Sequence, residues 1–284
     1  MHEVERPEGS QQRYSKVLPM GLRDMLRQVL PGDVRYWLRT IYNHRNLVGR
    51  GRFNLGYCVI CERQTMFVWE GVYLRDHYRC VRCWSIPRWR AVIQVLNLCY
   101  PGWRDLSIFE SSPGGMGSEQ LKRECVRYVP SHFWPGIEPG TVFRGVRCED
   151  LTRLTFPDDS FDVVVTQDVF EHVLRPERAF SEVARVLRSG GSHVFTVPFS
   201  RDHRTFVRAE MTPAGLQYLA RPEYHGNPIN DEGALVVTEW GDDLVDFIRR
   251  HSHLDTEIYN IHDRRLGLDG EYLDVFVSRK RNGS

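Results

Sequence analysis

The sequence predicts an α/β fold: a mostly parallel, seven-stranded sheet with helices on both faces, preceded by a small helical segment and a cysteine-rich module. Two observations carry this prediction. From residue 106 onward, short apolar segments of strand length alternate with helical segments, a pattern typical of parallel sheets built from crossover units. Before that region, two Cys-X-X-Cys pairs are separated by 18 residues. We therefore divide the chain into residues 1–56, 57–86 and 87–284.

Residues 1–56 combine a polar tail with amphipathic helices. Met1–Gln12 lacks the apolar stretch of a secretory signal, and no run in the chain approaches the roughly 20 apolar residues that span a bilayer. Helical spacing predicts one helix that stops at Pro31-Gly32 and a second that begins near Val34. Interspersed arginines make the N-terminal third basic in a chain of net charge +1. We expect these helices to pack on the next domain, while a membrane-surface or partner-binding hairpin and a homodimer stay open.

Residues 57–86 carry four of the seven cysteines, Cys58, Cys61, Cys80 and Cys83. Two such pairs supply the four thiolates that tetrahedral Zn²⁺ prefers, and they leave no open coordination position. We therefore predict a structural zinc knuckle, with free thiols or an iron–sulfur cluster as the alternatives. Thr65–Val68 and Gly71–Leu74 are the expected strands of its hairpin. Cysteines used this way fit a reducing cytosol, so we expect a cytoplasmic protein.

In the large domain, 87–284, the expected strands and helices alternate along the chain. The expected helices are Arg88–Cys99, Ser118–Glu124, Pro176–Leu187 (ended by Ser189-Gly190-Gly191) and Asp242–Arg250. The expected strands are Leu106–Glu110, Val126–Val129, Val142–Val146, Phe161–Gln167, His193–Pro198, Glu257–Ile261 and Tyr272–Ser278. Between them, the long segment 199–240 is rich in polar and aromatic residues. We interpret that insertion as a substrate cover.

Ligands of doubly wound sheets bind at the carboxyl ends of the strands. Here Glu110 ends the first strand, and the glycine-rich turn Ser112-Pro-Gly114-Gly115-Met-Gly117 follows. Downstream, residues 148–173 read CEDLTRLTFPDDSFDVVVTQDVFEHV, and RVLRSGG with FTVP comes after them. This pattern resembles the class I S-adenosylmethionine (SAM)-dependent methyltransferases, of the branch with an LPF-D-SFD turn and an EHV segment. The resemblance is dense over 148–198 and implies a Rossmann-like class I methyltransferase fold.

The resemblance implies a role for each matching residue. Glu110, Ser112, Gly114, Gly115 and Gly117 would surround the methionine tail of the cofactor. The Asp150 carboxylate would accept the adenine amino group beside a backbone contact from Leu151. Gln167 and Asp168 would line the sulfonium and substrate mouth, and His172 would cap the pocket. Asp150 capping a turn and His172 serving only as a helix residue are the structural alternatives.

Two departures from the family pattern matter. Ser-Pro-Gly-Gly-Met-Gly replaces the usual GxGxG turn. The acidic residue that binds both ribose hydroxyls at the end of the second strand is not evident, and Ser131 is the nearest candidate. A single hydroxyl cannot bridge a diol as a carboxylate does.

Methylation of a hydroxyl needs a general base, and His172 and His225 are the candidates. The alternative for His225 is that it holds a loop turn together. We expect an O-methyltransferase acting on a saccharide or polysaccharide precursor. One alternative is an RNA methyltransferase that grips phosphates through Arg75, Arg79, Arg82, Arg88 and Arg90, whose binding would weaken steeply with salt. Others are a natural-product tailoring enzyme with a small-molecule acceptor and a non-catalytic SAM-fold binding protein.

Overall fold

The computed structural model describes residues 31–226 and 233–281 of the chain. The chain divides into two compact units, with the boundary between Phe53 and Asn54. The described part of the first unit holds α2 (Gly32–Asn43) and the short α3 (Arg45–Gly49), so the helix predicted to begin near Val34 is confirmed. The helix predicted before Pro31 lies outside the described residues.

The second unit is built on a mixed, mostly parallel sheet, which confirms the predicted fold class. Its strand order is β16-β17-β9-β8-β4-β5-β7-β6. The strands are β4 (Ser107–Ser111), β5 (Arg127–His132), β6 (Val142–Phe143), β7 (Val146–Cys148), β8 (Phe161–Gln167), β9 (Leu187–Thr196), β16 (Asp255–Asn260) and β17 (Asp274–Arg279). β4 pairs in parallel with both β5 and β8, so strand order reverses at β4 as in doubly wound folds. β17 lies antiparallel between β9 and β16.

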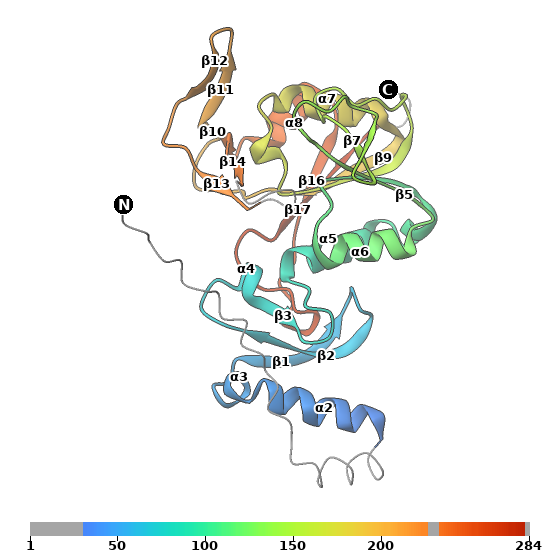
Figure 1. Cartoon of the computed structure of the whole chain (residues 1–284), viewed down its shortest axis with the longest axis vertical. Helices are drawn as coiled ribbons and strands as arrows, with labels where there is room; N and C mark the ends of the chain where they lie inside the picture. Colours follow the sequence, from blue (N-terminus) through green and yellow to red (C-terminus); the bar gives the residue numbers. More distant parts are fainter. Residues whose placement is uncertain (1–30, 227–232, 282–284) are drawn as a thin grey trace, which may run out of the picture. The chain divides into compact units, whose positions relative to one another are not determined.

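Helices cover both faces of this sheet because successive strand residues point to opposite sides. Ile108 packs with α5 (Pro87–Cys99) and α6 (Gly115–Glu124) in one core. Its neighbour Phe109 packs with α7 (Pro176–Val186) and α8 (Leu244–Ser252) in the other. Figure 1 shows the two helix pairs on opposite sides of the sheet. The short 3-10 turns are η1 (Trp103–Asp105), η2 (Phe170–His172) and η3 (Arg264–Leu266).

The cysteine module is a three-stranded sheet in the order β1-β2-β3 with a short helix. Its elements are β1 (Phe53–Cys58), β2 (Arg63–Trp69), α4 (Leu74–His77) and β3 (Tyr78–Cys80). The strand predicted over Gly71–Leu74 is wrong: Gly71 takes a turn conformation at φ +68°, and β3 pairs antiparallel with β2 instead. Phe67 and Tyr78 join the core formed by α5, so the module shares its interior with the large sheet.

Two further predicted elements differ from the structure. The strand predicted over Val142–Val146 is a hairpin, since Arg144 (φ 51°) and Gly145 (φ 79°) form a turn between β6 and β7. The Ser189–Gly191 stretch lies inside β9, where the pairing with β8 shifts register. A Cβ on Gly191 would lie 2.8 Å from the Asp162 carbonyl oxygen, so this irregular turn requires glycine.

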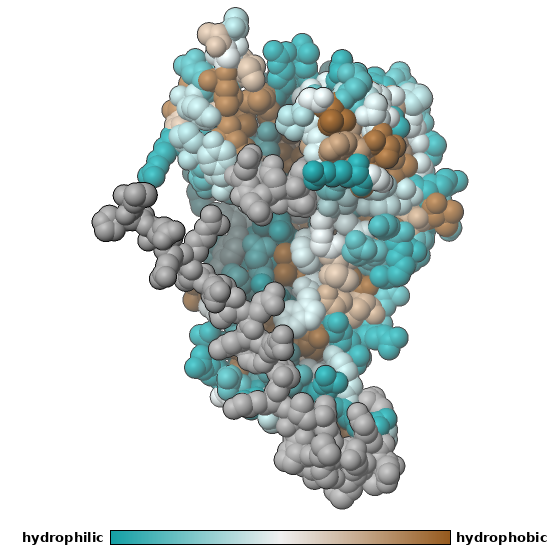
Figure 2. Space-filling view, viewed as in Figure 1, coloured by the Kyte–Doolittle hydropathy of each residue, from teal (hydrophilic) through white to brown (hydrophobic). Residues whose placement is uncertain are grey.

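The insertion 199–240 forms small antiparallel pairs. They are β10 (Phe206–Val207) with β15 (Thr238–Glu239), β11 (Ala209–Thr212) with β12 (Gly215–Tyr218), and β13 (Tyr224–His225) with β14 (Ala234–Leu235). The β11–β12 hairpin exposes Met211, Leu216 and Tyr218, and Figure 2 shows brown, hydrophobic atoms gathered over it. Among the described residues, every helix is too short or too polar to cross a membrane.

Candidate active site

A large cavity opens where β4 and β8 end. It encloses about 1490 Å³, which exceeds the roughly 300–1,000 Å³ typical of a site for one small ligand. The turn after β4, the segment after β8, the insertion and the cysteine module all contribute to its wall. The cavity thus lies at the point where strand order reverses, the usual ligand site of this architecture, and it has room for two molecules.

The glycine-rich turn contributes part of this wall. Ser112, Gly114 and Gly115 line the cavity, and Gly115 already begins α6, earlier than the predicted start at Ser118. A Cβ on Gly115 would lie 2.1 Å from the Trp89 ring, and one on Gly117 would lie 3.3 Å from the Trp89 Cβ. Gly117 therefore faces Trp89 and is not part of the cavity lining. These glycines let α5 and α6 approach each other.

Glu110 is not among the residues that line the cavity, and its predicted contact with a cofactor tail stays a prediction. Its side chain is fully buried and accepts hydrogen bonds from Ser118 Oγ (2.7 Å), Tyr128 Oη (2.6 Å) and Gln167 Nε2 (3.1 Å). Burial raises the pKa of Glu110, against the lowering effect of these three donors. Glu110 thus orients Gln167, which does line the cavity.

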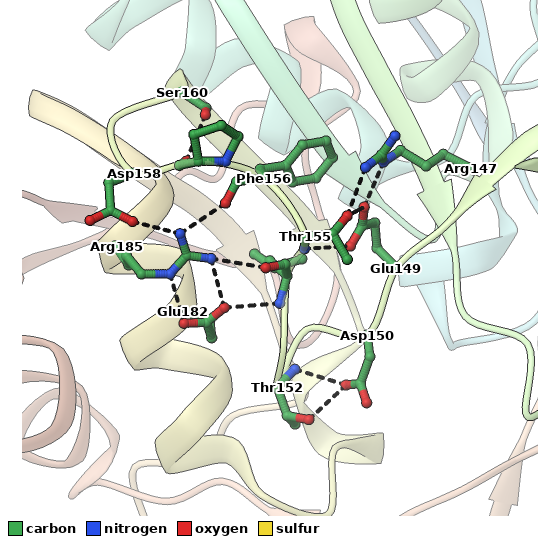
Figure 3. Close-up of polar contacts among 12 residues, drawn as sticks. Arg147, Glu149, Asp150, Thr152, Thr155, Phe156, Asp158, Ser160, Glu182 and Arg185 are labelled. Atoms are coloured by element: carbon green, nitrogen blue, oxygen red, sulfur yellow. Dashed lines mark hydrogen bonds and ion pairs between the residues drawn. The ribbon is translucent and has the colours of Figure 1, made fainter. Parts of the chain in front are cut away.

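Asp150 lines the cavity together with Leu151. Its Oδ1 accepts two hydrogen bonds from Thr152, one from the backbone N and one from Oγ1, both at 2.8 Å. Figure 3 shows this cap. Within the described residues, no hydrogen bond to Asp150 Oδ2 is present, so one carboxylate oxygen remains available to a ligand. The capping role and the binding role are therefore compatible.

Two part-buried ionic clusters fix the loop that presents Asp150. The buried Glu149 carboxylate accepts hydrogen bonds from Arg147 Nε (2.5 Å) and from the backbone N of Thr155 (2.9 Å). Arg185 donates to the carbonyl oxygens of Leu154 and Phe156 and to the Glu182 carboxylate. Both clusters appear in Figure 3. Charged side chains that form hydrogen bonds with backbone N–H and carbonyl groups in this way hold a loop in one conformation.

Ser131 is not among the residues that line the cavity, and its predicted contact with a ribose stays a prediction. Its side chain is fully buried, and its carbonyl oxygen accepts a hydrogen bond from Ser112 N at 2.7 Å. The cavity wall beyond β5 consists of Phe133, Trp134 and Pro135 instead. Sequence reasoning missed these residues because β5 extends to His132, three residues beyond its predicted end.

Asp168 follows β8 and is held by two arginines. Arg75 Nη2 lies 2.6 Å from Asp168 Oδ2, Arg88 Nη1 lies 2.5 Å from the same oxygen, and Thr196 Oγ1 donates to Oδ1 at 2.9 Å. Burial acts to raise the pKa of Asp168, but the two guanidinium groups outweigh it and hold that pKa at about 2. Asp168 is therefore ionised and is a poor proton acceptor at neutral pH.

His172 and His225 lie close together although they are far apart in the sequence. Their ring centroids are 5.4 Å apart, and both rings line the cavity. His172 Nδ1 lies 2.8 Å from the Leu235 carbonyl oxygen. Because a carbonyl only accepts, Nδ1 carries the proton and Nε2 presents a lone pair. Burial lowers the pKa of His172, which favours this neutral form.

The five arginines predicted to grip RNA are mostly occupied within the chain. Arg75 and Arg88 pair with Asp168. Arg90 is fully buried and donates to the carbonyl oxygens of Tyr78 and Gly267, so it is inaccessible to a phosphate. Arg79 is exposed and Arg82 half-buried, and each donates a hydrogen bond to a backbone carbonyl oxygen, Arg79 to Asp76 and Arg82 to Gln64.

The four cysteines of the two pairs form one cluster. All four Sγ atoms lie within 4.8 Å of one another, with Cys58 to Cys83 at 3.7 Å and Cys61 to Cys80 at 3.9 Å. Zn–S bonds of about 2.3 Å in a tetrahedron place sulfurs about 3.8 Å apart, whereas a disulfide needs about 2.05 Å. The cluster is consistent with a zinc site.

The strand order defines a Rossmann-type α/β domain with its cavity at the topological switch point. Residues 119–195 match a family model described as "Methyltransferase domain". With the motif residues that line the cavity, this match identifies a class I SAM-dependent methyltransferase domain in the chain.

Three curated relatives are methyltransferases. The sarcosine/dimethylglycine N-methyltransferase of Halorhodospira halochloris is 30% identical over 131 residues, 45% of this chain and 45% of that protein. The phosphatidylethanolamine N-methyltransferase of Cereibacter sphaeroides is 43% identical over 82 residues, 29% and 39% of the two chains. The malonyl-[acyl-carrier protein] O-methyltransferase of Paenibacillus sp. (strain JDR-2) is 31% identical over 101 residues, 34% and 33% of the two chains. The alignments span less than half of each relative.

Sequence reasoning also missed the part that Trp89, Arg75 and Glu171 play in the cavity wall. Trp89 is an ordinary helix residue in the sequence, and only the glycines opposite it hint at a close contact. Arg75 was interpreted as a phosphate ligand because its partner, Asp168, is 93 residues away. Glu171 lies inside the quoted EHV segment, so its position was visible although no role was assigned to it.

Proposed function

We propose that this chain is a SAM-dependent methyltransferase that methylates an oxygen of a polyhydroxylated acceptor of the saccharide class. One observation carries the proposal. Family-motif residues at one end of the cavity (Gly114, Gly115 and Asp150) face the same space as the two histidines, His172 and His225. Cofactor and acceptor would then meet in one site, which is what transfer between two bound molecules requires.

The residues at the first end suit the cofactor. Gly114 lets a ligand approach the start of α6 without a Cβ in the way, and the uncommitted Oδ2 of Asp150 matches an exocyclic amino group. Phe133 and Trp134 offer apolar surface in place of the acidic residue that relatives use for the ribose. SAM, when bound, supplies a methyl group on a positively charged sulfur.

The other end of the cavity suits a polar acceptor. The histidines and Glu223 supply hydrogen-bonding groups, and His203 and Arg175 add to them from the rim. We assign activation of the acceptor hydroxyl to the His172–His225 pair. Asp168 keeps a positioning role, because its ionised carboxylate fixes Arg75 and Arg88.

We further propose that the four-cysteine cluster holds a structural Zn²⁺. Four thiolate ligands leave no position for a substrate. Cys58 and Cys80 belong to the core that also contains α5, and none of the four cysteines lines the cavity. Its role would be to fold a module that is too small to be stable alone and that carries Arg75 to the cavity.

A second candidate is methylation of an amine nitrogen, as the names of the first two relatives indicate for those proteins. An RNA acceptor lacks comparable support, because Arg75, Arg88 and Arg90 are engaged internally.

The test has two parts. Calorimetric titration of the full chain with SAM and with its demethylated product should show binding of both at micromolar or better affinity; binding of neither would refute the cofactor assignment. Incubation with methyl-labelled SAM and separate saccharide, amine and RNA fractions should then label the saccharide fraction. Label in the amine fraction alone would replace the O-methylation proposal with the second candidate.

A further inference from the structure

Glu171 is a buried carboxylate without a hydrogen-bond partner. The residue is 1% exposed, and neither of its carboxylate oxygens accepts a hydrogen bond from the described residues. An unsatisfied buried carboxylate costs folding free energy unless a cation or proton compensates it. Among the described residues no arginine forms an ion pair with Glu171: Arg75 and Arg88 pair with Asp168 and act on Glu171 only through longer-range attraction. Glu171 nevertheless lines the cavity.

His172 is adjacent to Glu171, and its Nε2 atom is available to a ligand. Nε2 lies 3.7 Å from Glu171 Oε1, while the Nδ1–H group donates a hydrogen bond to the Leu235 carbonyl oxygen at 2.8 Å. A histidine that binds a metal usually donates its other ring N–H to a carbonyl or carboxylate, which fixes the ring and the tautomer. The ring of His172 is therefore oriented as a metal ligand is.

His225 completes the group through the insertion. β13 carries His225 and pairs with β14, which carries Leu235. The backbone N of Val237, just after β14, donates to the Glu171 carbonyl oxygen at 2.7 Å, so this hairpin is fastened to the turn that holds Glu171 and His172. One ligand atom from each of the three side chains lies within 4.8 Å of the others. Ligands around an ion at about 2.1 Å are roughly 3 to 4 Å apart, so a side-chain adjustment of about 1 Å closes the set.

We propose that Glu171, His172 and His225 form a second metal site, for a divalent first-row transition ion, in the acceptor half of the cavity. Two imidazoles and one carboxylate suit Zn²⁺, Fe²⁺, Mn²⁺ or Co²⁺ and leave open coordination positions. This arrangement differs from the four-cysteine cluster, whose coordination is closed. The ion would compensate the Glu171 charge.

The use of the open positions rests on the proposed function. An acceptor oxygen bound there would be held and polarised by the ion acting as a Lewis acid. Metal binding itself depends only on the three side chains. The two proposals can therefore fail separately.

The experiment uses the full chain with Zn²⁺ already bound by the cysteines and Co²⁺ as the probe. Wild type should take up one further equivalent of Co²⁺, with visible d–d absorption and without the charge-transfer band that thiolate ligands give. Glu171→Gln and His225→Ala should each weaken Co²⁺ binding at least tenfold. His203→Ala, which removes another histidine of the cavity wall, is the matched control and should bind Co²⁺ like wild type.

Thermal unfolding of each zinc-loaded variant, measured before Co²⁺ is added, shows whether the variant is folded. His225→Ala is the variant that keeps the test valid if Glu171→Gln fails to fold, since His225 lies on the half-exposed hairpin. The metal site would be overturned if the zinc-loaded wild type takes up no Co²⁺, or if His225→Ala binds Co²⁺ with unchanged affinity. A calorimetric titration with demethylated cofactor run in parallel separates the proposals: cofactor binding without Co²⁺ uptake leaves the methyltransferase proposal intact, and the reverse leaves the metal site intact.

Discussion

Arg75 and Asp168 form a largely buried ion pair in which one nitrogen, Arg75 Nη2, lies 2.8 Å from Asp168 Oδ1 and 2.6 Å from Oδ2. Arg75 belongs to the cysteine module and Asp168 follows the central strand β8. Arg75 Nε also donates to the Tyr272 carbonyl oxygen at 3.2 Å. The module therefore forms part of the cavity wall and is not an independent appendage.

Removing Arg75 should destabilise the protein strongly. Arg75→Met leaves the Asp168 charge buried with Arg88 as its remaining ionic partner, and breaking a buried pair costs about 3 kcal/mol. Urea unfolding measures the change in the free energy of unfolding. Arg204→Met removes the exposed partner of Asp243 and, as the control, should change it by less than about 0.5 kcal/mol. Equal effects of the two substitutions would show that the Arg75 pair contributes little.

The same pair predicts an acid-dependent loss of stability. Because the folded-state pKa of Asp168 is about 2, below its ordinary value of 3.8, Asp168 adds about 2 kcal/mol of stability. That contribution is fully present above about pH 4 and disappears as the pH falls through the folded-state pKa. Asp168→Asn should therefore be less stable than wild type at pH 7, and the two should converge toward pH 2. Parallel curves of unfolding free energy against pH would contradict this.

Local sequence patterns predicted the sheet well where one signal dominated. β8 has its predicted bounds, because three consecutive valines form a run buried on both faces. The β6–β7 hairpin was missed because the five residues Val142–Val146 begin and end with apolar, strand-forming side chains, and only the turn at Arg144-Gly145 distinguishes a hairpin from one strand. The cysteine module's strands were misplaced for a related reason: the partner of β2 follows α4 and does not directly follow the turn at Gly71.

The site was predictable where the family motif supplies residues in a continuous run. Asp150, Leu151, Gln167 and His172 all line the cavity. Contacts such as Arg75 with Asp168 depend on how distant segments pack, and no local pattern encodes them. The burial of Glu110 likewise follows from the position of α6 over β4 and could not be inferred from a strand end alone.

Removal of zinc should affect the cavity as well as the module. A strong chelator, or Cys83→Ser, should unfold the β1–β3 sheet, lower the melting temperature and weaken binding of the demethylated cofactor, because Arg75 and α4 lose their support. Circular dichroism melts and calorimetry measure both effects. Cys99→Ser, a cysteine outside the cluster, should leave zinc content unchanged. Full cofactor affinity after zinc loss would mean that the module and the cavity are not coupled.

Substitutions of Asp150 and Thr152 can distinguish the proposed role of Asp150 in cofactor binding from its role in capping the turn through Thr152. Asp150→Asn keeps an oxygen for Thr152 but removes the charge, so cofactor affinity should fall about tenfold or more with little change in stability. Thr152→Val removes the hydroxyl donor only and should lower stability by about 1 kcal/mol with a smaller effect on affinity. Calorimetry and urea unfolding report the two quantities. A cofactor dissociation constant that Asp150→Asn does not alter would assign Asp150 to capping alone.

The last prediction concerns turnover at the two histidines. His172→Ala and His225→Ala each remove a group that faces the acceptor end of the cavity, so each should lower the rate of methyl transfer about a hundredfold or more. Affinity for the demethylated cofactor should change little, since that ligand is assigned to the glycine turn and Asp150. Rates measured with saturating SAM, next to calorimetry of the same preparations, separate the two effects, and a loss of rate that merely tracks a loss of cofactor binding would indicate a distorted pocket. If both variants turn over at the wild-type rate, acceptor activation by this pair is wrong and must be sought among the other polar groups of the cavity.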